Sequence, residues 1–354
     1  MGSKFWPKGG LPGILHHYTE TLVTFEYTPS PTAHQPHSLL FIGGLGDGLA
    51  TTSYTVDLVR ALAQTEWSFF TLNLTSSYQS WGLGHLDRDT DEIAQAARYI
   101  KEYKKSKFGG DGGKIVLMGH STGSQCVLHY LSRPNPHDSK PAFDPDLEHV
   151  LRLPVDGAIM QAPVSDREAI LWVLQHGFKG RSAAEVQAVW DELGVLAKEA
   201  VAKGGKEVDT VLPLWMTAYI YPTDTPISAR RFLSLFSPDS PGSPGEDDMF
   251  SSDLGDEEFE KSFGAVGRRG LLRHRLMVLI SGADQAVPDW VDKEKLLARW
   301  KAAADREGER RVWDPNSGLI PGASHALSND DQAEPRKFLV GRVLGYLQGA
   351  EDVQ

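Results

Sequence analysis

Residues 114–124 combine a buried strand, a tight turn and the start of a helix around one serine. Their sequence is K-I-V-L-M-G-H-S-T-G-S, and the apolar run Ile115–Met118 is typical of a strand covered on both faces. Gly119 and Gly123 flank Ser121 in a G-x-S-x-G pattern, and the residues that follow favour a helix. Glycines let strand and helix approach closely without a Cβ clash. The stretch therefore predicts a nucleophile elbow, which presents the Ser121 hydroxyl to a base.

Strand and helix patterns alternate through most of the chain. Helices of ten or more residues between short apolar strands indicate a mostly parallel sheet with helices on both faces, an α/β fold. Ile14–Tyr27 alternates loosely and favours antiparallel strands at one edge of the sheet. Late in the chain, Glu309–Trp313 is the predicted last strand region. Apolar runs predict the other strands at Ser38–Ile42, Trp67–Leu72, Val155–Met160 and Leu276–Ile280.

The alternation is interrupted between residues 164 and 274, where the pattern is mainly helical. We expect residues 164–274 to form a cap or lid at one end of the sheet, over a core made of residues 1–163 and 275–354. Within the cap, residues 237–262 are rich in Pro, Ser, Gly and acidic side chains, which predicts a solvated, flexible loop. Trp172 and Trp215 are candidates for the lining of a substrate pocket; the alternative is that they form the small core of the cap itself.

The composition excludes several classes of protein. Lys and Arg number 36 and Asp and Glu 47, so the net charge of −11 argues against a nucleic-acid-binding protein. The single cysteine, Cys126, excludes an intramolecular disulfide and a cysteine-based metal site. No apolar run approaches the roughly 18 residues of a membrane span, and no secretory signal pattern is visible. We expect a cytoplasmic protein that acts on neither membranes nor nucleic acid, of undetermined oligomeric state.

A serine nucleophile needs a base within hydrogen-bond reach and an acid that orients the base. The strand Leu276–Ile280 runs into a G-x-D turn, which places Asp284 just past the strand end. His325, in a loop of small residues, is the histidine that follows Asp284 in the sequence. We predict that Ser121, Asp284 and His325 form a catalytic triad in the chain order nucleophile, acid, base. Asp166 is the alternative acid, because some hydrolases place the acid one strand earlier.

The tetrahedral intermediate of acyl transfer needs two backbone N–H donors. Thr122 directly follows the nucleophile and is the predicted first donor. The second should come from Gly43-Gly44-Leu45-Gly46, after the strand that ends at Ile42; we assign it to Leu45, with Gly44 as the second choice. This glycine cluster lacks the Lys-Ser/Thr of a P-loop and does not match G-x-G-x-x-G, so a nucleotide site is disfavoured. The chemistry needs neither a metal nor an organic cofactor.

Four stretches carry a resemblance to known proteins. They are F-I-G-G-L-G-D-G-L at 41–49, S-Y-Q-S-W-G-L-G-H-L at 77–86, L-M-G-H-S-T-G-S-Q at 117–125 and I-P-G-A-S-H at 320–325. With these in register, the chain resembles the α/β-hydrolase superfamily over nearly its whole length. More narrowly, it is similar to the fungal siderophore-esterase family of the fusarinine C esterase type, long known only as a domain of unknown function.

The resemblance implies a cytoplasmic serine esterase that cuts the ester bonds of a hydroxamate siderophore of the fusarinine or triacetylfusarinine type, so that intracellular iron is released. It also places residues 77–86 at the mouth of the site. Gly44, Trp81, Trp172 and Trp215 are the candidates for contact with this small-molecule substrate. The alternatives are another small-molecule esterase or thioesterase, and an α/β-hydrolase-fold binding module without catalytic activity.

Overall fold

The computed structural model describes residues 4–139, 144, 147–306 and 311–352. Within these residues an eight-stranded sheet has the strand order β1-β2-β4-β3-β5-β6-β7-β8. β1 and β2 pair antiparallel, as do β2 and β4, and all other neighbours are parallel. The strands are β1 Gly13–His17, β2 Val23–Tyr27, β3 His37–Ile42, β4 Trp67–Leu72, β5 Ile115–His120, β6 Gly157–Gln161, β7 Leu276–Ser281 and β8 Gly318–Ile320.

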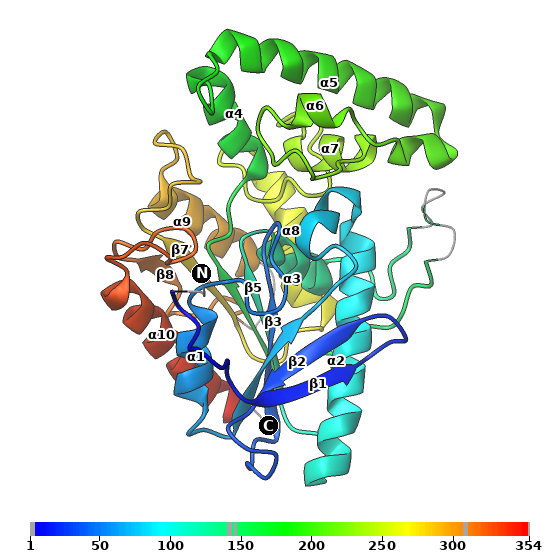
Figure 1. The fold of residues 1–354 in the computed structure, drawn as a ribbon. Coiled ribbons are helices and arrows are strands. Elements are labelled where there is room, and N and C mark those ends of the chain that lie inside the picture. The colour runs from blue at the N-terminus through cyan, green and yellow to red at the C-terminus, as the bar shows by residue number, and fades with distance from the viewer. Residues whose placement is uncertain (1–3, 140–143, 145–146, 307–310, 353–354) are drawn as a thin grey trace.

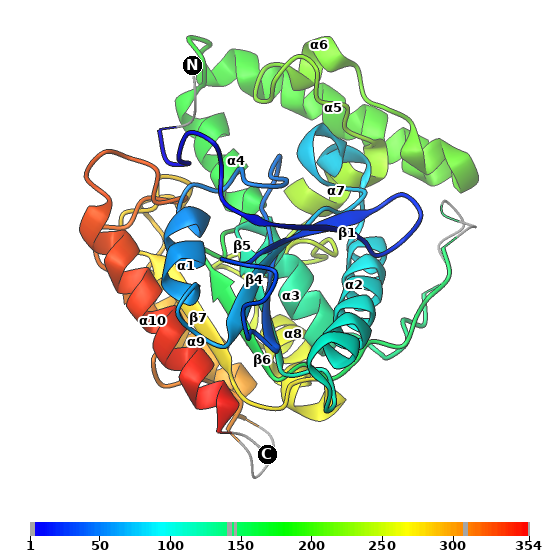
Figure 2. The same ribbon diagram turned by 60° about the horizontal axis from the view of Figure 1, so that its bottom comes forward.

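Helices cover both faces of the sheet, because its central strands are apolar on both sides. Every residue of β5, β6 and β7 is buried. Figure 2 shows α1 and α10 on one side of the sheet and α2, α3 and α8 on the other. The predicted mostly parallel sheet with helices on both faces is confirmed. The bounds of these helices are α1 Thr55–Leu62, α2 Leu86–Phe108, α3 Thr122–Ser132, α8 Asp256–Arg269, α9 Lys293–Ala304 and α10 Ala333–Glu351.

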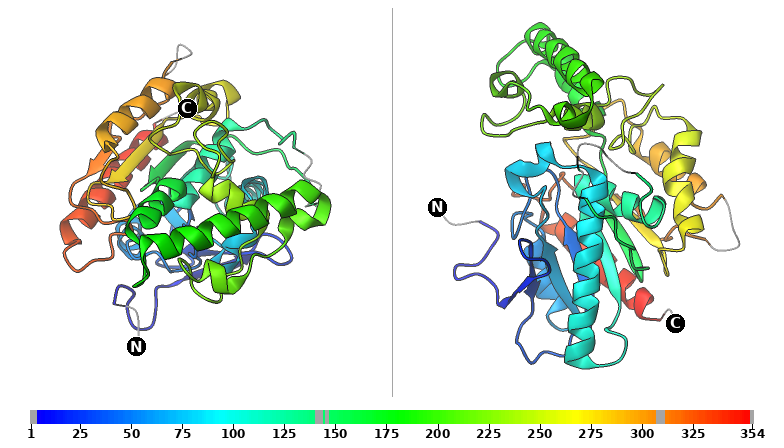
Figure 3. Two further views of the ribbon diagram at one scale, coloured as in Figure 1. Left: turned by 90° about the horizontal axis from the view of Figure 1, so that it is seen from above. Right: turned by 90° about the vertical axis from the view of Figure 1, so that its right-hand side faces the viewer.

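Four helices lie together above one end of the sheet (Figure 1), and we call residues 165–236, which contain them, the cap. Seen from the side, in the right-hand view of Figure 3, the cap forms a separate layer above the sheet. It has its own apolar core, in which Trp190 packs against Phe232 and Phe236 with ring centroids 4.8 and 4.7 Å apart. The cap helices are α4 Asp166–His176, α5 Ala183–Lys203, α6 Leu214–Thr217 and α7 Ala229–Phe236, with the short 3₁₀ helix η2 Gly205–Asp209.

The structure corrects the predicted extent of the cap. Residues 256–269 form α8, which packs against α3 and α9 in the layer that covers the sheet. Phe259 and Phe263 cause this placement, because both are buried against Trp300 of α9. The prediction that the cap extends to residue 274 is therefore wrong for α8.

The prediction of a solvated acidic loop at residues 237–262 is wrong for part of the segment: residues 238, 239 and 241–243 are exposed, but several of its carboxylates are buried or paired. Asp247 and Asp248 are 2% and 6% exposed. Asp247 accepts hydrogen bonds from Arg231 of α7 at 2.7 and 2.8 Å, so a buried ion pair ties this segment to the cap. Asp253 pairs with Arg167 of α4 at 2.6 Å. Composition alone does not reveal the arginines that neutralise these acids.

The last strand lies later than predicted. β8 spans Gly318–Ile320, whereas Trp313 makes only an isolated bridge to Leu276. Glu309 and Arg310 of the predicted strand lie outside the described residues. Val312 and Trp313 are buried in the core on the α8 and α9 side of the sheet, and this burial explains the apolar pattern that resembled a strand. In the described part of the chain, no helix is both long and apolar enough to cross a membrane.

Candidate active site

The turn between β5 and α3 holds Ser121 in a strained backbone conformation. Its φ is 53° and its ψ is −123°, a region that a residue with a Cβ rarely occupies. Both flanking glycines are required by close packing. A Cβ on Gly119 would lie 2.2 Å from the carbonyl oxygen of Gly123, and one on Gly123 would lie 2.3 Å from that of Ile42. The predicted strand–turn–helix therefore exists, and its glycines act sterically as the sequence suggested.

Three side chains from distant segments form one hydrogen-bonded chain at this turn. His325 Nε2 lies 2.9 Å from Ser121 Oγ, and His325 Nδ1 lies 2.8 Å from Asp284 Oδ2. The other carboxylate oxygen of Asp284 accepts a hydrogen bond from the N–H of Ala286 at 2.9 Å. The Asp284 side chain is fully buried, whereas 18% of the His325 side chain is exposed. In this geometry His325 Nε2 can take the proton of Ser121, while the Asp284 carboxylate fixes the orientation of the ring through Nδ1.

Asp166, the alternative acid, has a different partner. It lies partly buried at the first turn of α4 and accepts a hydrogen bond from Gln125 Nε2 at 3.1 Å. Burial, and then the nearby charge of Asp247, raise the pKa of Asp166 to about 7. Among the described residues, Asp284 is the carboxylate at hydrogen-bond distance from His325.

His120, the second residue of the G-x-S-x-G motif, packs beneath the candidate base. Its ring centroid lies 5.0 Å from that of His325. His120 Nδ1 lies 2.6 Å from Gln161 Oε1, and the amide of Gln161 donates to Ser281 Oγ at 3.1 Å. Burial, and then the charge of His325, lower the pKa of His120 to about 4, so this imidazole is neutral near neutral pH. A neutral ring supports His325 without opposing the positive charge that His325 gains as a base.

The loop after β3 lies directly beside the serine. A Cβ on Gly44 would lie 2.8 Å from Ser121 Cβ, so only glycine allows this approach. Within the described residues, the N–H groups of Leu45 and Thr122 have no hydrogen-bond partner. The N–H of Gly44, the second choice, is already donated to Asp47 Oδ2 at 2.9 Å. The loop therefore offers the Leu45 and Thr122 amides, but not that of Gly44, to an oxyanion.

Asp47 fixes the shape of this loop, a role that the sequence analysis missed. Besides the Gly44 amide, its carboxylate accepts hydrogen bonds from the hydroxyls of Thr51 at 2.7 Å and Thr52 at 2.9 Å. The sequence contained a signal for this role: Asp47 comes three residues after the glycine pair, and two threonines follow it at positions 51 and 52. Gln285 was also missed; its side-chain oxygen accepts the N–H of His325 at 3.0 Å and so holds the histidine loop.

The four predicted substrate contacts lie in different environments. Gly44 and Trp81 line a small cavity of about 30 Å³ together with Leu45 and Thr122, a volume suited to water. Trp81, in the 3₁₀ helix η1 Tyr78–Leu83, is buried and packs 4.9 Å from Tyr221 of the cap. The structure does not bring the remaining two to this cavity. Trp172 stacks on His176 with ring centroids 4.3 Å apart, and Trp215 is 64% exposed.

Comparisons with known proteins agree with this architecture. A family model described as "Protein of unknown function (DUF1749)" matches residues 5–348. The fusarinine C esterase sidJ of Aspergillus fumigatus is 70% identical over 349 residues, which cover 98% of each chain. The solved structure of the siderophore hydrolase EstB from Aspergillus fumigatus is 66% identical, with a TM-score of 0.87, and the match covers 98% of this chain and 100% of that one. The predicted resemblance to the fusarinine C esterase family is confirmed.

More distant structures share the fold alone. An "Alpha/Beta hydrolase fold protein of unknown function" is 13% identical with a TM-score of 0.53, over 97% of this chain and 98% of that one. The predicted α/β-hydrolase fold is therefore confirmed.

Proposed function

The chain belongs to the DUF1749 family, and we propose that it is a serine esterase that hydrolyses the ester bonds of a fusarinine-type hydroxamate siderophore. The observation that carries this proposal is the hydrogen-bonded chain from Ser121 through His325 to Asp284. The relatives that are 70% and 66% identical, a fusarinine C esterase and a siderophore hydrolase, support this substrate class.

In the proposed reaction, Ser121 Oγ attacks the ester carbonyl and forms a tetrahedral intermediate. His325 Nε2 takes the serine proton and then delivers it to the leaving alcohol, which leaves an acyl-serine. Water, activated by the same nitrogen, then releases the acid and restores Ser121. Asp284 accepts the Nδ1–H of His325 throughout and stabilises the imidazolium. The proton of Ser121 leaves with the alcohol and a proton of the water replaces it on Ser121, so the cycle consumes only ester and water.

The oxyanion of the intermediate is held by the backbone. Among the residues that the structure describes, none accepts a hydrogen bond from the N–H groups of Leu45 and Thr122, and the Thr122 amide also lies at the positive N-terminus of α3. Gly44 and Trp81 border the same small cavity, so in this proposal they shape the wall next to the carbonyl. Because that cavity is sized for water, the bulk of a siderophore has to lie outside it.

Three cations of the cap have structural partners. Arg231 pairs with Asp247, and Arg230 binds Asp209 at 2.7 Å and the carbonyl of Gly84 at 2.9 Å. Lys179 donates to the carbonyl of Ile220 at 2.8 Å. These side chains hold the cap together, so substitutions at them test the stability of the cap rather than substrate contact.

The substrate is tested with the purified chain and iron-loaded or iron-free fusarinine C, analysed by mass spectrometry. Each cleaved ester adds the mass of one water to the products. Ser121→Ala serves as the matched control, and a simple acyl ester serves as a second substrate. Turnover of the simple ester without turnover of the siderophore would reject the siderophore and leave the esterase mechanism standing. The proposal also places the protein in the cytoplasm, where an ester-cleaved siderophore releases its iron, and fractionation of a cell that expresses the chain tests this location.

A further inference from the structure

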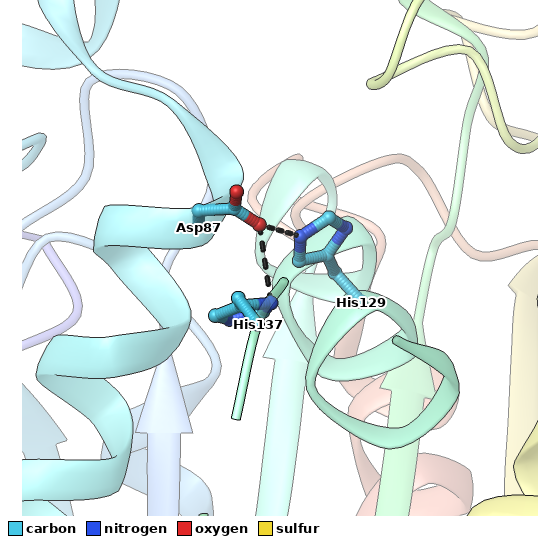
Figure 4. A group of neighbouring side chains, drawn as sticks. All are labelled: Asp87, His129 and His137. Carbon is cyan, nitrogen blue, oxygen red and sulfur yellow. Dashed lines mark hydrogen bonds and ion pairs between the residues drawn. The ribbon is translucent and has the colours of Figure 1, made fainter. Parts of the chain in front are cut away.

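A second group of reactive side chains lies at the far end of the helix that follows Ser121. Asp87 of α2, His129 of α3 and His137 of the segment after α3 come together there, and all three are buried (Figure 4). His129 is eight residues beyond Ser121, which corresponds to about 12 Å along the axis of α3. The esterase mechanism uses none of these groups. We call them the Asp87 cluster.

The two imidazoles aim at the same carboxylate oxygen. His129 Nε2 lies 2.7 Å and His137 Nδ1 lies 3.2 Å from Asp87 Oδ1. One ligand atom from each of the three residues lies within 4.8 Å of the other two. Nitrogen and carboxylate oxygen atoms gathered at such separations are a donor set that divalent zinc accepts.

His137 has a hydroxyl neighbour at its second ring nitrogen. Thr90 Oγ1 lies 2.7 Å from His137 Nε2, and it also lies 2.9 and 3.1 Å from the carbonyl oxygens of Leu86 and Asp87. When the Thr90 hydrogen goes to one of these carbonyl oxygens, Thr90 accepts a hydrogen bond from His137 Nε2–H, and Nδ1 carries a lone pair. In this tautomer the lone pair faces the Asp87 carboxylate oxygen, an arrangement that a cation between them stabilises.

In this tautomer, His137 also has the outer-shell contact of a metal-binding histidine. Such a histidine usually donates its second ring N–H to a neighbour that fixes the ring orientation. Thr90 supplies this contact for His137. The hydroxyl of Ser139 supplies a similar contact to the second carboxylate oxygen of Asp87.

Glu246 lies at the open side of the cluster. Its Oε1 lies 3.6 Å from His129 Nε2, and its side chain is 32% exposed. It is not part of the group of three residues whose ligand atoms lie within 4.8 Å of one another, so it is a neighbouring charge and not a fourth ligand. Tetrahedral zinc with bonds of about 2.0 Å separates neighbouring ligand atoms by about 3.3 Å. The separation of 3.2 Å between His137 Nδ1 and Asp87 Oδ1 is close to this value, and the 2.7 Å hydrogen bond between His129 and Asp87 would lengthen when an ion binds.

A surface cavity gives an ion access to this position. It has a volume of about 260 Å³, and its lining includes both His129 and Glu246. The cluster thus combines a buried donor set with an opening, which a site that exchanges its metal requires.

We propose that Asp87, His129 and His137 bind one zinc ion. The three ligands come from α2, α3 and the segment that follows α3. The ion therefore ties the helix behind Ser121 to the helix beside it. Three protein ligands leave the fourth position of the tetrahedron to a water molecule from the cavity, and the contribution of the ion is to stability.

The test is zinc binding by the whole protein. The chain is stripped with a chelator, exposed to a small excess of zinc, dialysed and analysed for metal content, and its thermal unfolding is followed with and without zinc. We expect one zinc per chain and a rise in Tm of roughly 3–5 °C. Binding below a tenth of an equivalent with an unchanged Tm would overturn the proposal and leave a hydrogen-bonded network only.

His137→Gln and His149→Gln form the matched pair of variants. A glutamine amide at 137 can still donate to Thr90 but lacks the Nδ1 lone pair, so zinc should fall below a tenth of an equivalent. His149 lies in the same network, 2.7 Å from Asp91, but outside the donor set, so His149→Gln should keep one zinc per chain. Equal zinc binding by the two variants would refute the assignment.

Asp87→Asn keeps the test decisive if His137→Gln does not fold. The amide keeps the shape of the side chain but lacks the negative charge that faces both histidines. We expect this variant to bind zinc at least tenfold more weakly than the unaltered protein in a competition titration with a chromogenic chelator. An unchanged affinity would remove Asp87 from the site and contradict the three-ligand proposal.

Discussion

Replacing Asp47 with asparagine should slow ester cleavage although Asp47 does not touch the serine. Its carboxylate accepts three hydrogen bonds, from the Gly44 amide and the hydroxyls of Thr51 and Thr52. Asparagine keeps one acceptor oxygen, so about one of the three bonds is lost, and a hydrogen bond to a charged group contributes about 1.5–3 kcal/mol. If the loss of this hydrogen bond weakens the stabilisation of the oxyanion in the transition state by the same amount, kcat falls about 10–150-fold. Removal of a complete oxyanion donor lowers kcat by about 10²–10³, which bounds this effect from above.

The assay compares steady-state hydrolysis of one soluble acyl ester by Asp47→Asn and by Asp57→Asn. Asp57 lies on the neighbouring helix α1 and contacts Arg336 at 3.3 Å, so it provides the same chemical change outside the loop. We expect Asp47→Asn to lower kcat with KM within about threefold, because the oxyanion forms only in the transition state. Asp57→Asn should stay within about twofold of the unaltered protein. Equal kcat values in the two variants would refute the assignment of Asp47 to the oxyanion loop.

Three further substitutions follow from the partners of buried carboxylates. Asp284→Asn should lower kcat about 10⁴-fold because His325 loses the acceptor for its Nδ1–H, and a loss below tenfold would contradict this role. Asp166→Asn should raise Tm more at pH 8 than at pH 5. The pKa of about 7 in the folded state lies above the unfolded value, so the cost of ionising Asp166 develops as pH rises toward 7. An equal shift of Tm at both pH values would contradict the raised pKa of Asp166. Asp247→Ala should lower the free energy of unfolding by about 3–5 kcal/mol in a urea titration, because it leaves Arg231 buried without its main partner; a loss below about 1 kcal/mol would contradict that pairing.

The sequence was informative where function requires a local pattern. Two glycines and an apolar strand within eleven residues specify the elbow. In the structure, a Cβ on either glycine would clash with a backbone carbonyl oxygen, which is the steric reason that the sequence analysis gave. Asp284 follows β7 directly, so the strand pattern places it at the edge of the sheet where β5 ends with Ser121. Parallel strands bring their carboxyl ends together, which is why residues 204 positions apart in the chain meet at 2.9 Å.

Contacts between distant segments were not predictable in the same way. The acidic residues at 246–253 look solvated until Arg231 and Arg167 are brought to them by the cap. Trp172 and Trp215 are aromatic residues of the predicted cap. The local sequence does not distinguish an aromatic residue that lines a pocket from one that lies on an exposed face. β8 has only three residues, too short for a periodic pattern, whereas Val312 and Trp313 carry the apolar signal without joining the sheet through a ladder.

The most direct measurement of the central claim is the reaction of Ser121 itself. The unaltered chain and Ser121→Ala are incubated with a fluorophosphonate probe, the modified peptide is identified by mass spectrometry, and hydrolysis of an acyl ester is measured on the same samples. Circular dichroism checks that the variant is folded. We predict one label on Ser121, which eliminates hydrolysis, and neither labelling nor turnover in Ser121→Ala. A label on another residue, or more than a trace of hydrolysis by the folded variant, would contradict the assignment of Ser121 as the nucleophile.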